Sequence, residues 1–368
     1  MRPPARAAAP VSGAAEMTDM TMVRAGELYR RRVFRKTMMV FAAFAALALA
    51  ICVDIGVGPG RYTPVEVLTA LFSPGSVEPK LSIIVWDVRM PVAVMAVMIG
   101  AMLGVAGAQM QTILHNPLAD PFTLGISSAA SFGAALAIAL GVGLWPVGGN
   151  FLIAGNAFVF ALATSLVLFF FTRMRGVTIE TFVLVGIALF FTFNALLAFI
   201  QYQSSEAQLQ QIIFWMMGSL ARATWTKIGI CLLLLAVILP LAWVRNPMMT
   251  ALAMGDERAA SLGVPVARLR LEMLASISLL AATATAFVGT IGFIGLVGPH
   301  IARMLVGEDQ RYFMPASAAA GALILSIAST LSKAITPGVI YPIGIITALV
   351  GVPFFVSLIL SIRKETWR

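Results

Sequence analysis

The side chains that could carry covalent, redox or metal chemistry are few in this sequence. Cys52 and Cys231 each lie inside a different apolar run, and the only histidines are His115 and His300. Their spacing matches neither a disulfide framework nor a metal-ligand pattern. The sequence also lacks the G-x-x-x-x-G-K-[ST] loop that cradles nucleotide phosphates. We therefore predict no catalytic residue, no metal ligand and no cofactor bound by this chain, and we interpret both histidines as structural or loop residues.

Ion-coupled transport chemistry needs a titratable or anionic group inside the membrane. All 16 acidic residues lie outside the predicted spans or near their ends, and Asp54, Glu180 and Glu272 come nearest to apolar sequence. We expect no Asp, Glu, Lys or Arg at the midplane of a span. This pattern argues against an ion-coupled secondary transporter, which remains the alternative from another class, and energy for uphill movement would have to come from another subunit.

The composition indicates which elements hold these residues. Of 368 residues, 60% are hydrophobic and 11% are charged, whereas soluble domains carry roughly 25% charged residues. Apolar runs of roughly membrane-spanning length without period-2 alternation favour helices over barrel strands. We predict an all-α polytopic membrane protein with about ten transmembrane helices, at 38–57, 90–112, 122–142, 146–171, 178–201, 225–244, 269–291, 293–306, 312–332 and 342–362. The eighth is short and interrupted by Gly and Pro, so we expect a broken or half-length element surrounded by protein.

Lys and Arg set the predicted orientation, because cytoplasmic loops carry an excess of them. We predict that residues 1–37 form a disordered basic cytoplasmic tail, although RRRVFRK before the first span also resembles a twin-arginine export signal. Both termini are then cytoplasmic, and the domain of ten spans covers 38–368. The net charge of +9 reflects topology, so no nucleic-acid partner is expected. The basic residues assigned to the outer face are Arg61, Lys80, Arg89, Arg222, Lys227 and Lys333.

Five ordered blocks carry a family resemblance. The first, at 89–133, contains HNPLADP, in which Asn116-Pro117 ends one span and Asp120-Pro121 opens the next. The others are FWMMGSLARATW, ALAMGDERAASLGVPV, GFIGLVGPHIARMLVG and YPIGIITALVGVPFF. In order and over nearly the whole chain after residue 37, these resemble the permeases of type II ABC importers, which import iron–siderophores, haem and cobalamin.

The resemblance implies the type II ABC importer permease fold and a set of partners. These are a second permease subunit, as in a homodimer, two cytoplasmic subunits that hold ATP and Mg, and a periplasmic substrate-binding protein. It also implies a multi-pass protein of the bacterial inner membrane that works by alternating access. The favoured solute is a ferric siderophore, because the Q-x-x-x-FWxxGSL pattern and the polar residues of the fifth span fit that class. Haem or cobalamin import is the alternative, and a membrane scaffold that transports nothing is a further rival.

The resemblance also assigns roles to residues. Segment 247–266 would form cytoplasmic coupling helices that dock on the ATPase, with a solvated amphipathic loop as the alternative; its candidate residues are Asp256, Glu257, Arg258, Ala260, Leu262, Gly263 and Val264. Arg89 and Lys333 would dock the binding protein, although Val92 stands where the family carries a second Arg and interfacial anchoring remains possible for Arg89. Segment 204–217 would help gate the outer mouth. The candidate residues of the loop and gate motifs are Asn116, Pro117, Asp120, Pro121, Phe214, Trp215 and Gly218.

Overall fold

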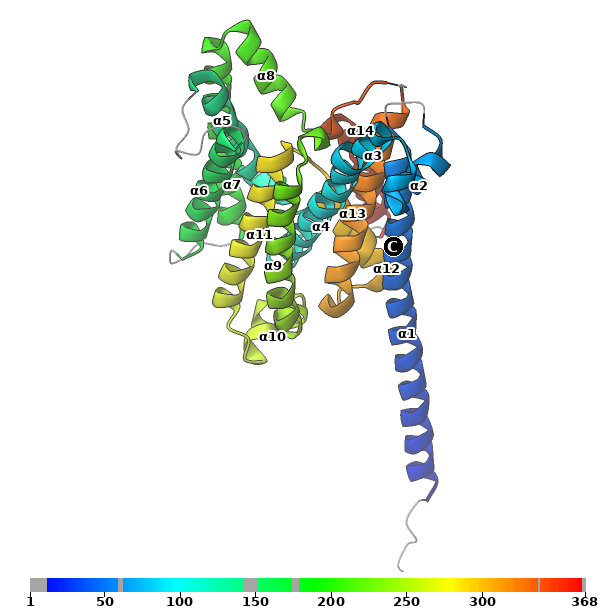
Figure 1. Cartoon of the computed structure of the whole chain (residues 1–368). Coiled ribbons are helices and arrows are strands. Elements are labelled where there is room, and N and C mark those ends of the chain that lie inside the picture. The colour runs from blue at the N-terminus through cyan, green and yellow to red at the C-terminus, as the bar shows by residue number, and fades with distance from the viewer. Residues whose placement is uncertain (1–11, 59–61, 142–150, 174–178, 337, 366–368) are drawn as a thin grey trace, which may run out of the picture.

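The computed structural model describes residues 12–58, 62–141, 151–173, 179–336 and 338–365, and within these ranges it contains helices and loops but no β-strand. Figure 1 shows one bundle from which the first helix projects. The long elements are α1 (Ser12–Gly56), α4 (Met90–Ile113), α5 (Ile126–Leu140), α6 (Leu152–Arg173), α7 (Ile179–Gln203), α9 (Trp225–Leu252), α11 (Val266–Val288), α12 (Ile294–Val306), α13 (Gln310–Ala334) and α14 (Ile343–Glu365). The short connecting helices are α2 (Pro64–Phe72), α3 (Pro79–Ile83), α8 (Glu206–Met216) and α10 (Asp256–Ser261).

The ten long elements follow the order of the ten predicted spans. Seven of them are long and apolar enough to cross a membrane, and three shorter apolar helices cover Ile126–Leu140, Ile294–Val306 and Ile343–Ser357. The prediction of an all-α polytopic membrane protein is therefore confirmed. The first five residues of the predicted fourth span, 146–150, lie outside the described residues.

The N-terminal segment differs from its prediction. Residues 12–37 belong to α1, which continues without a break into the first span, whereas we predicted a disordered tail over 1–37. Residues 1–11 lie outside the described part of the chain. The Ala-, Pro- and Arg-rich composition of this segment suggested disorder, but continuation of an existing helix needs no new nucleation step.

Two other boundaries moved for a similar reason. The second span begins at Pro79 and runs through a π-helical turn, η2 (Ile84–Arg89), into α4, so the apolar helix is 35 residues long. The sixth span ends at Leu252 instead of 244, which makes the first part of the predicted coupling segment the last turns of α9. The prediction also missed α2, whose first turn is closed by a capping box between Thr63 and Glu66.

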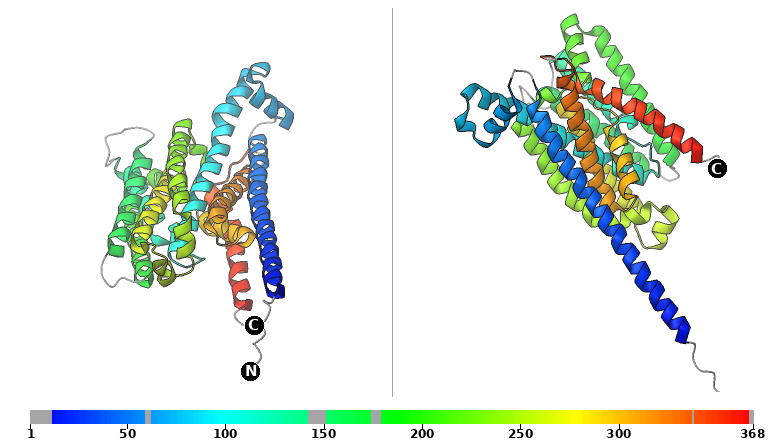
Figure 2. Two further views of the ribbon diagram at one scale, coloured as in Figure 1. Left: turned by 90° about the horizontal axis from the view of Figure 1, so that it is seen from below. Right: turned by 90° about the vertical axis from the view of Figure 1, so that its right-hand side faces the viewer.

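The helix α4 lies at the centre of the bundle and α7 at its edge. In the most apolar stretch of the helix Pro79–Ile113, which contains α4, 67% of the residues are buried, compared with 11% in the corresponding stretch of α7. Small residues let the neighbours of α4 approach closely: a Cβ on Gly100 would meet the backbone of Gly321 in α13, and one on Gly107 would meet that of Gly295 in α12. The views in Figure 2 show the helices inclined to one another around this centre.

The predicted broken element is present between α11 and α13. The chain leaves α11 at Val288, runs through residues 289–293 without regular structure, and then forms α12, which has 13 residues. Phe293 adopts a left-handed conformation with φ of 70° at the start of α12. Since a non-helical backbone at membrane depth is tolerated only where protein surrounds it, the burial of Ile294, Gly295 and Leu296 accounts for its position inside the bundle.

Candidate functional site

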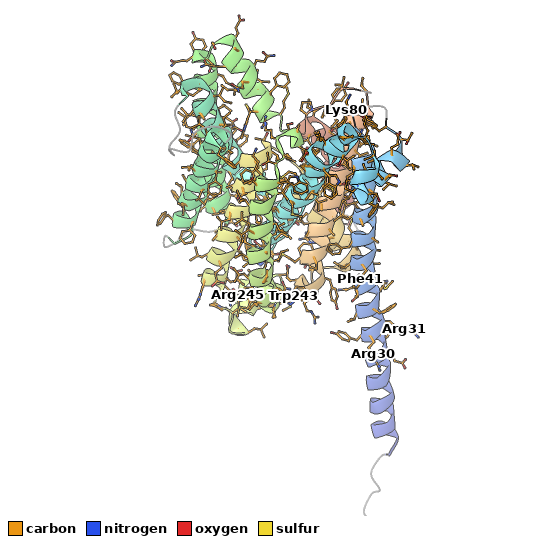
Figure 3. All side chains as sticks on the ribbon, in the orientation of Figure 1. Arg30, Arg31, Phe41, Lys80, Trp243 and Arg245 are labelled. Atoms are coloured by element: carbon orange, nitrogen blue, oxygen red, sulfur yellow. The ribbon has the colours of Figure 1, made fainter. Side chains whose placement is uncertain are left out.

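The candidate residues are divided between the two ends of the bundle. Figure 1 shows α8 at one end and α10 at the opposite end. In Figure 3, Arg30, Arg31 and Arg245 lie toward the end of the bundle that carries α10. Lys80 lies at the opposite end, where α2, α3 and α8 are found. Segments 204–217 and 247–266, predicted to lie on opposite sides of the membrane, thus lie at opposite ends of the bundle, and their roles as gate and coupling segment stay predictions.

The helix α10 presents a small exposed surface. It is flanked by Gly255 and Gly263, which both adopt positive φ values (108° and 81°) that other residues rarely adopt. Leu262 is 66% exposed, and the exposed candidates around it are Glu257, Arg258, Ala260 and Gly263. Val264 differs from them, because it is half-buried and packs against the core. The exposed face could enter a cleft of another protein, whereas Val264 holds the segment to the bundle.

Asp256 faces the bundle and not the surface that Leu262 forms. Its carboxylate accepts from Arg270 Nη2 at 2.9 Å, and Arg270 Nε donates to the carbonyl of Ile113 at 3.2 Å. His115 Nε2 lies 2.7 Å from the carbonyl oxygen of Leu252 and 3.8 Å from the carboxylate of Asp256. Our sequence analysis did not single out Arg270, although a basic residue just inside a predicted span is a signal that a partner must lie nearby.

The loop between α4 and α5 is held by the residues that its sequence predicts. The Asn116 side chain accepts from the backbone N–H of Leu118 at 2.9 Å, and Asp120 caps the 3₁₀ turn η3 (Pro121–Leu124) by accepting from Phe122 N–H at 3.1 Å. Asp120 is buried beside Gly295, where a Cβ would lie 2.9 Å from its Oδ1. Burial raises the pKa of Asp120 from 3.8 to about 6, and the hydrogen bond from Phe122 opposes part of that shift.

Two of the sequence blocks meet the end of α11 near the end of α8. The Gly218 carbonyl accepts from Ile343 N–H at 3.2 Å, the Met217 carbonyl accepts from Gly344 N–H at 3.0 Å, and Ser219 N–H donates to the Val288 carbonyl at 2.7 Å. The side chain of Thr290 also donates to the Met216 carbonyl. We call this backbone junction, formed by residues 216–219, 288–290 and 343–344, the outer knot. It joins the α8–α9 connection to the end of α11 and to the start of α14.

Glycine is required at two positions of the outer knot by close backbone approach. A Cβ on Gly344 would lie 2.5 Å from the Met217 carbonyl oxygen, and one on Gly218 would lie 2.8 Å from the Thr290 carbonyl oxygen. Of the predicted gate residues, Phe214 is exposed and Trp215 is buried. The carbonyl of Phe214 accepts from Arg222 Nη2 at 3.1 Å, and the Arg222 guanidinium lies 5.7 Å from the centre of the Trp215 ring.

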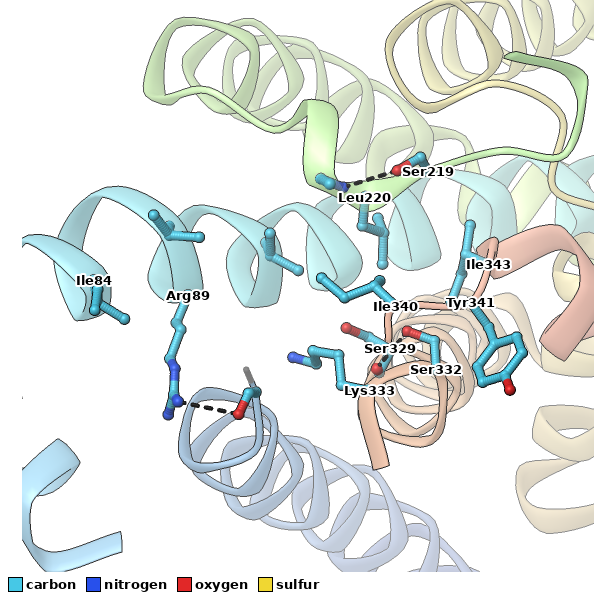
Figure 4. A pocket seen from close by; sticks show the side chains of 14 residues that line it. Ile84, Arg89, Ser219, Leu220, Ser329, Ser332, Lys333, Ile340, Tyr341 and Ile343 are labelled. Atoms are coloured by element: carbon cyan, nitrogen blue, oxygen red, sulfur yellow. Dashed lines mark hydrogen bonds between the residues drawn. The ribbon is translucent and has the colours of Figure 1, made fainter. Parts of the chain in front are cut away.

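Arg89 and Lys333, predicted to dock a binding protein, are both buried in the single chain. Arg89 donates to the carbonyls of Ile55, Gly56 and Gly58 at 3.1 to 3.2 Å, where α1 ends. Figure 4 shows Arg89 and Lys333 on two sides of a small pocket beside the end of α1. These internal partners argue against a direct ion pair between either side chain and another protein, and the docking role stays a prediction.

His300 lies beside Phe354, with ring centres 5.8 Å apart. Its place within α12, packed against this aromatic ring, is compatible with the structural role that the sequence predicts, which stays a prediction. Among the described residues, no group of three or more His, Cys, Asp or Glu side chains could hold a metal ion.

A helical bundle of long apolar elements, with a broken eighth element and a short helix at each end, defines a polytopic membrane protein. The chain belongs to the FecCD transport family, whose model matches residues 46–361. It is 36% identical to the hemin transport permease HmuU of Yersinia pestis over 76% of this chain and 84% of that one. It is 35% identical to the vitamin B12 import permease BtuC of Escherichia coli O9:H4, covering 79% and 88%.

A solved structure extends the likeness to the fold. An inward-facing conformation of a protein described as a metal-chelate type ABC transporter matches with a TM-score of 0.75 and 29% identity, over 88% of this chain and 99% of that one. The recognised resemblance to the permeases of type II ABC importers is thus confirmed. The chain is a permease of an ABC transporter, and hence a transport subunit.

Proposed function

We propose that this chain forms the transmembrane path of an importer that moves a metal chelate, and most specifically a ferric siderophore, across the bacterial inner membrane by alternating access. The observation that carries the proposal is the placement of α10 and α8 at opposite ends of one bundle. An exposed coupling helix at one end and a gate helix at the other allow a movement at the first to change access at the second.

The energy in this proposal comes from ATP hydrolysed by partner subunits that dock on α10. Leu262, Ala260 and Glu257 form the exposed part of this contact. The positions of the buried charged side chains among the described residues support a source of energy outside the chain. Asp54 and Lys333 lie near the ends of α1 and α13, and Lys227 lies in the first turn of α9. Asp120 lies in the α4–α5 loop, and Arg89, where η2 joins α4, binds the carbonyls at the end of α1.

A second copy of the permease completes the proposed path. The helix α7 is largely exposed in the single chain, and its exposed side chains include Leu184, Phe191, Phe199 and Tyr202. A partner permease, lipid or solute would cover this face. With a periplasmic binding protein at the α8 end and two ATP-binding subunits at the α10 end, both termini are cytoplasmic.

The choice of a ferric siderophore over haem or cobalamin rests on chemistry near α8. Gln203, Gln210 and Gln211 are exposed there beside Tyr202 and Phe214. Amides and hydroxyls suit the many oxygen atoms of a siderophore, whereas a porphyrin or corrin would favour a more continuous aromatic surface. Haem and cobalamin are the alternative solutes, because relatives of this chain are named as permeases for hemin and for vitamin B12.

The test uses the chain in vesicles with its cognate ATP-binding subunits and binding protein. We expect uptake of labelled ferric siderophore that requires ATP and stops when the Walker lysine of the ATP-binding subunit is mutated. Uptake that persists in that mutant, or that follows an imposed ion gradient without ATP, contradicts the mechanism. Parallel uptake of haem and cobalamin tests the solute, and preference for either of them overturns the siderophore assignment alone.

A further inference from the structure

The attachment of α10 to the bundle is concentrated in a few polar contacts. Gly255 and Gly263, at positive φ, bound the helix on both sides. Within it, Ala259 is buried, while Glu257, Arg258 and Ala260 are exposed. Asp256, in the first turn of α10, forms an ion pair with Arg270 of the long helix α11. Because the chain can bend at Gly255 and Gly263, a displacement of α10 would be transmitted to the bundle mainly through its side-chain contacts and less through the backbone on either side.

Arg270 connects α10 to the end of α4. Its Nη2 lies 2.9 Å from each oxygen of the Asp256 carboxylate, and its Nε donates to the Ile113 carbonyl. Ile113 is the last residue of α4, whose final carbonyls have no partner within the helix. The planar guanidinium holds both acceptors at once in fixed geometry, which a lysine ammonium cannot reproduce.

His115 makes a second connection, from the end of α9 to the loop that follows α4. Its backbone adopts φ of 48°, a left-handed conformation that costs a residue other than glycine free energy unless its surroundings hold it there. The ring supplies that restraint through the 2.7 Å contact to Leu252 O. A carbonyl oxygen can only accept, so Nε2 carries the proton, and the same N–H faces the Asp256 carboxylate at 3.8 Å.

The loop that His115 restrains also contacts α12, the broken eighth element, in space. Asn116 follows His115, and Asp120 lies against Gly295 in the first turn of α12. A cavity lined in part by His115, Asn116, His300 and Gln310 separates the rest of the loop from α12 and α13. This space would let the loop move without a clash, while Asp120 keeps contact with α12.

We propose that His115, Arg270 and Asp256 form the link through which movement of α10 reaches the 114–121 loop and α12. This inference rests on the proposed function and adds the route of coupling within the chain. The three are positioning residues: Asp256 receives the displacement, Arg270 passes it to the end of α4, and His115 ties the end of α9 to the same loop. Loss of any one should separate ATP hydrolysis from solute movement while the bundle stays intact.

The experiment measures uptake and ATP hydrolysis together in the reconstituted complex, using ferric siderophore as the probe. For Arg270→Gln we expect ATP hydrolysis within about twofold of the unchanged chain and uptake per ATP reduced about tenfold, which corresponds to about 1.4 kcal/mol of lost coupling. Arg270→Lys should recover part of the ratio. The matched control is Arg268→Ala, since Arg268 lies on the same helix, is exposed and pairs only with Glu272 among the described residues; its ratio should not change.

His115→Gly separates transmission from a purely structural role. Glycine adopts φ of 48° without strain, so if His115 served only the turn, His115→Gly would keep both its stability and its uptake per ATP. If His115 transmits movement, the variant should still co-purify with the ATP-binding subunit and keep its melting temperature, but its uptake per ATP should fall. His115→Asn should retain more of the ratio, because Asn tolerates the left-handed region and carries an N–H donor.

The outcomes are distinguishable from failure of the proposed function. If the unchanged complex shows no uptake driven by ATP, the proposed function is wrong. If the unchanged complex transports but either Arg270→Gln or His115→Gly keeps its ratio of uptake to hydrolysis, the link as proposed is wrong. If Arg270→Gln does not assemble with the ATP-binding subunits, the double variant Asp256→Asn with Arg270→Gln is used, because it removes the unpaired carboxylate. An unchanged ratio of uptake to ATP hydrolysis in the double variant also contradicts the link.

Discussion

Lys333 Nζ lies 2.7 Å from Asp54 Oδ1, and this ion pair, between residues 279 apart in the chain, joins the end of α1 to the end of α13. Both side chains are buried. The Asp54 carboxylate also accepts from Ser329 and Thr330 at 3.0 Å, and Lys333 donates to the Asp54 carbonyl. The pair is therefore fully enclosed in a network, unlike the exposed charge expected of a docking residue.

Removal of one member of this pair should be costly. Lys333→Met leaves Asp54 as a buried carboxylate without its cation, and we expect a loss of about 3 to 5 kcal/mol in stability. The double variant Asp54→Asn with Lys333→Met should recover most of it. Thermal unfolding of the purified permease in detergent measures both. If Lys333→Met instead weakens binding-protein affinity and leaves the melting temperature unchanged, the docking role predicted from the sequence is correct.

Arg89 should stabilise the C-terminal end of α1 through its hydrogen bonds to the carbonyls there. Arg89→Lys keeps the charge but cannot donate to the three carbonyls of Ile55, Gly56 and Gly58 together. We expect greater protease sensitivity near residue 58 and a stability loss of about 1 to 3 kcal/mol. Lys80→Ala, at the same end of the bundle, is the control. A change confined to the salt dependence of binding-protein association would point to docking instead.

Leu262→Asp should uncouple the ATP-binding subunits while the bundle remains folded. Leu262 is 66% exposed, so a charge there costs the isolated permease little. A carboxylate at the centre of a protein contact costs several kcal/mol of affinity when unpaired. Co-purification and ATP hydrolysis measure the effect. Val264→Asp is not equivalent, because Val264 packs against the core, and normal transport by Leu262→Asp would show that this face is not the docking surface.

Gly344→Ala should disturb the outer knot. The new methyl group would meet the Met217 carbonyl oxygen, so the α14 end must move away from the α8–α9 connection. We expect a loss of about 1 to 3 kcal/mol and altered labelling of the exposed Phe214 region when cysteines are placed beside it. Gly229→Ala is the matched control: Gly229 lies within α9 with nothing near its Cβ position, so alanine there should be neutral or stabilising. An unaffected Gly344→Ala variant would mean that the knot adapts easily.

The buried Asp120 predicts a pH dependence of stability. Its pKa is raised from 3.8 to about 6 by burial, so between these values the unfolded chain loses a proton that the folded chain keeps. Stability from this group is complete below pH 3.8 and is lost as the pH rises through about 6. Asp120→Asn keeps an acceptor for Phe122 and should remove this dependence, with a gain of order 1 to 3 kcal/mol at pH 7. Parallel melting curves of both proteins at pH 4, 5, 6 and 7 test it.

Local sequence patterns were sufficient for the number and order of the ten long helices, although not for the short helix α2. Long apolar runs, interrupted by Asn116-Pro117 and by the Gly/Pro-rich 292–307 block, marked ten elements because a helix is the only open structure that satisfies its backbone in lipid. The family resemblance and the mix of polar and apolar residues at 256–264 also predicted a docking surface around Leu262, and Leu262 is exposed, whereas Val264 of the same set is half-buried. Helix ends were less predictable, as α1 and α9 show, because an existing helix can continue into polar sequence without a new nucleation step.

The tertiary structure alone decided which residues meet. By sequence, Arg89 and Lys333 were outer-face charges and His115 was a loop residue; in the fold the first two secure the end of α1, and His115 lies beside Asp256, 141 positions away. Composition and periodicity report the environment of each residue, but an ion pair or a backbone contact depends on distances between elements that are remote in sequence. The sequence therefore determined a helical membrane permease, while the packing of α1, α4, α9, α10 and α13 determined which charges hold the bundle together and which remain at the surface of α10.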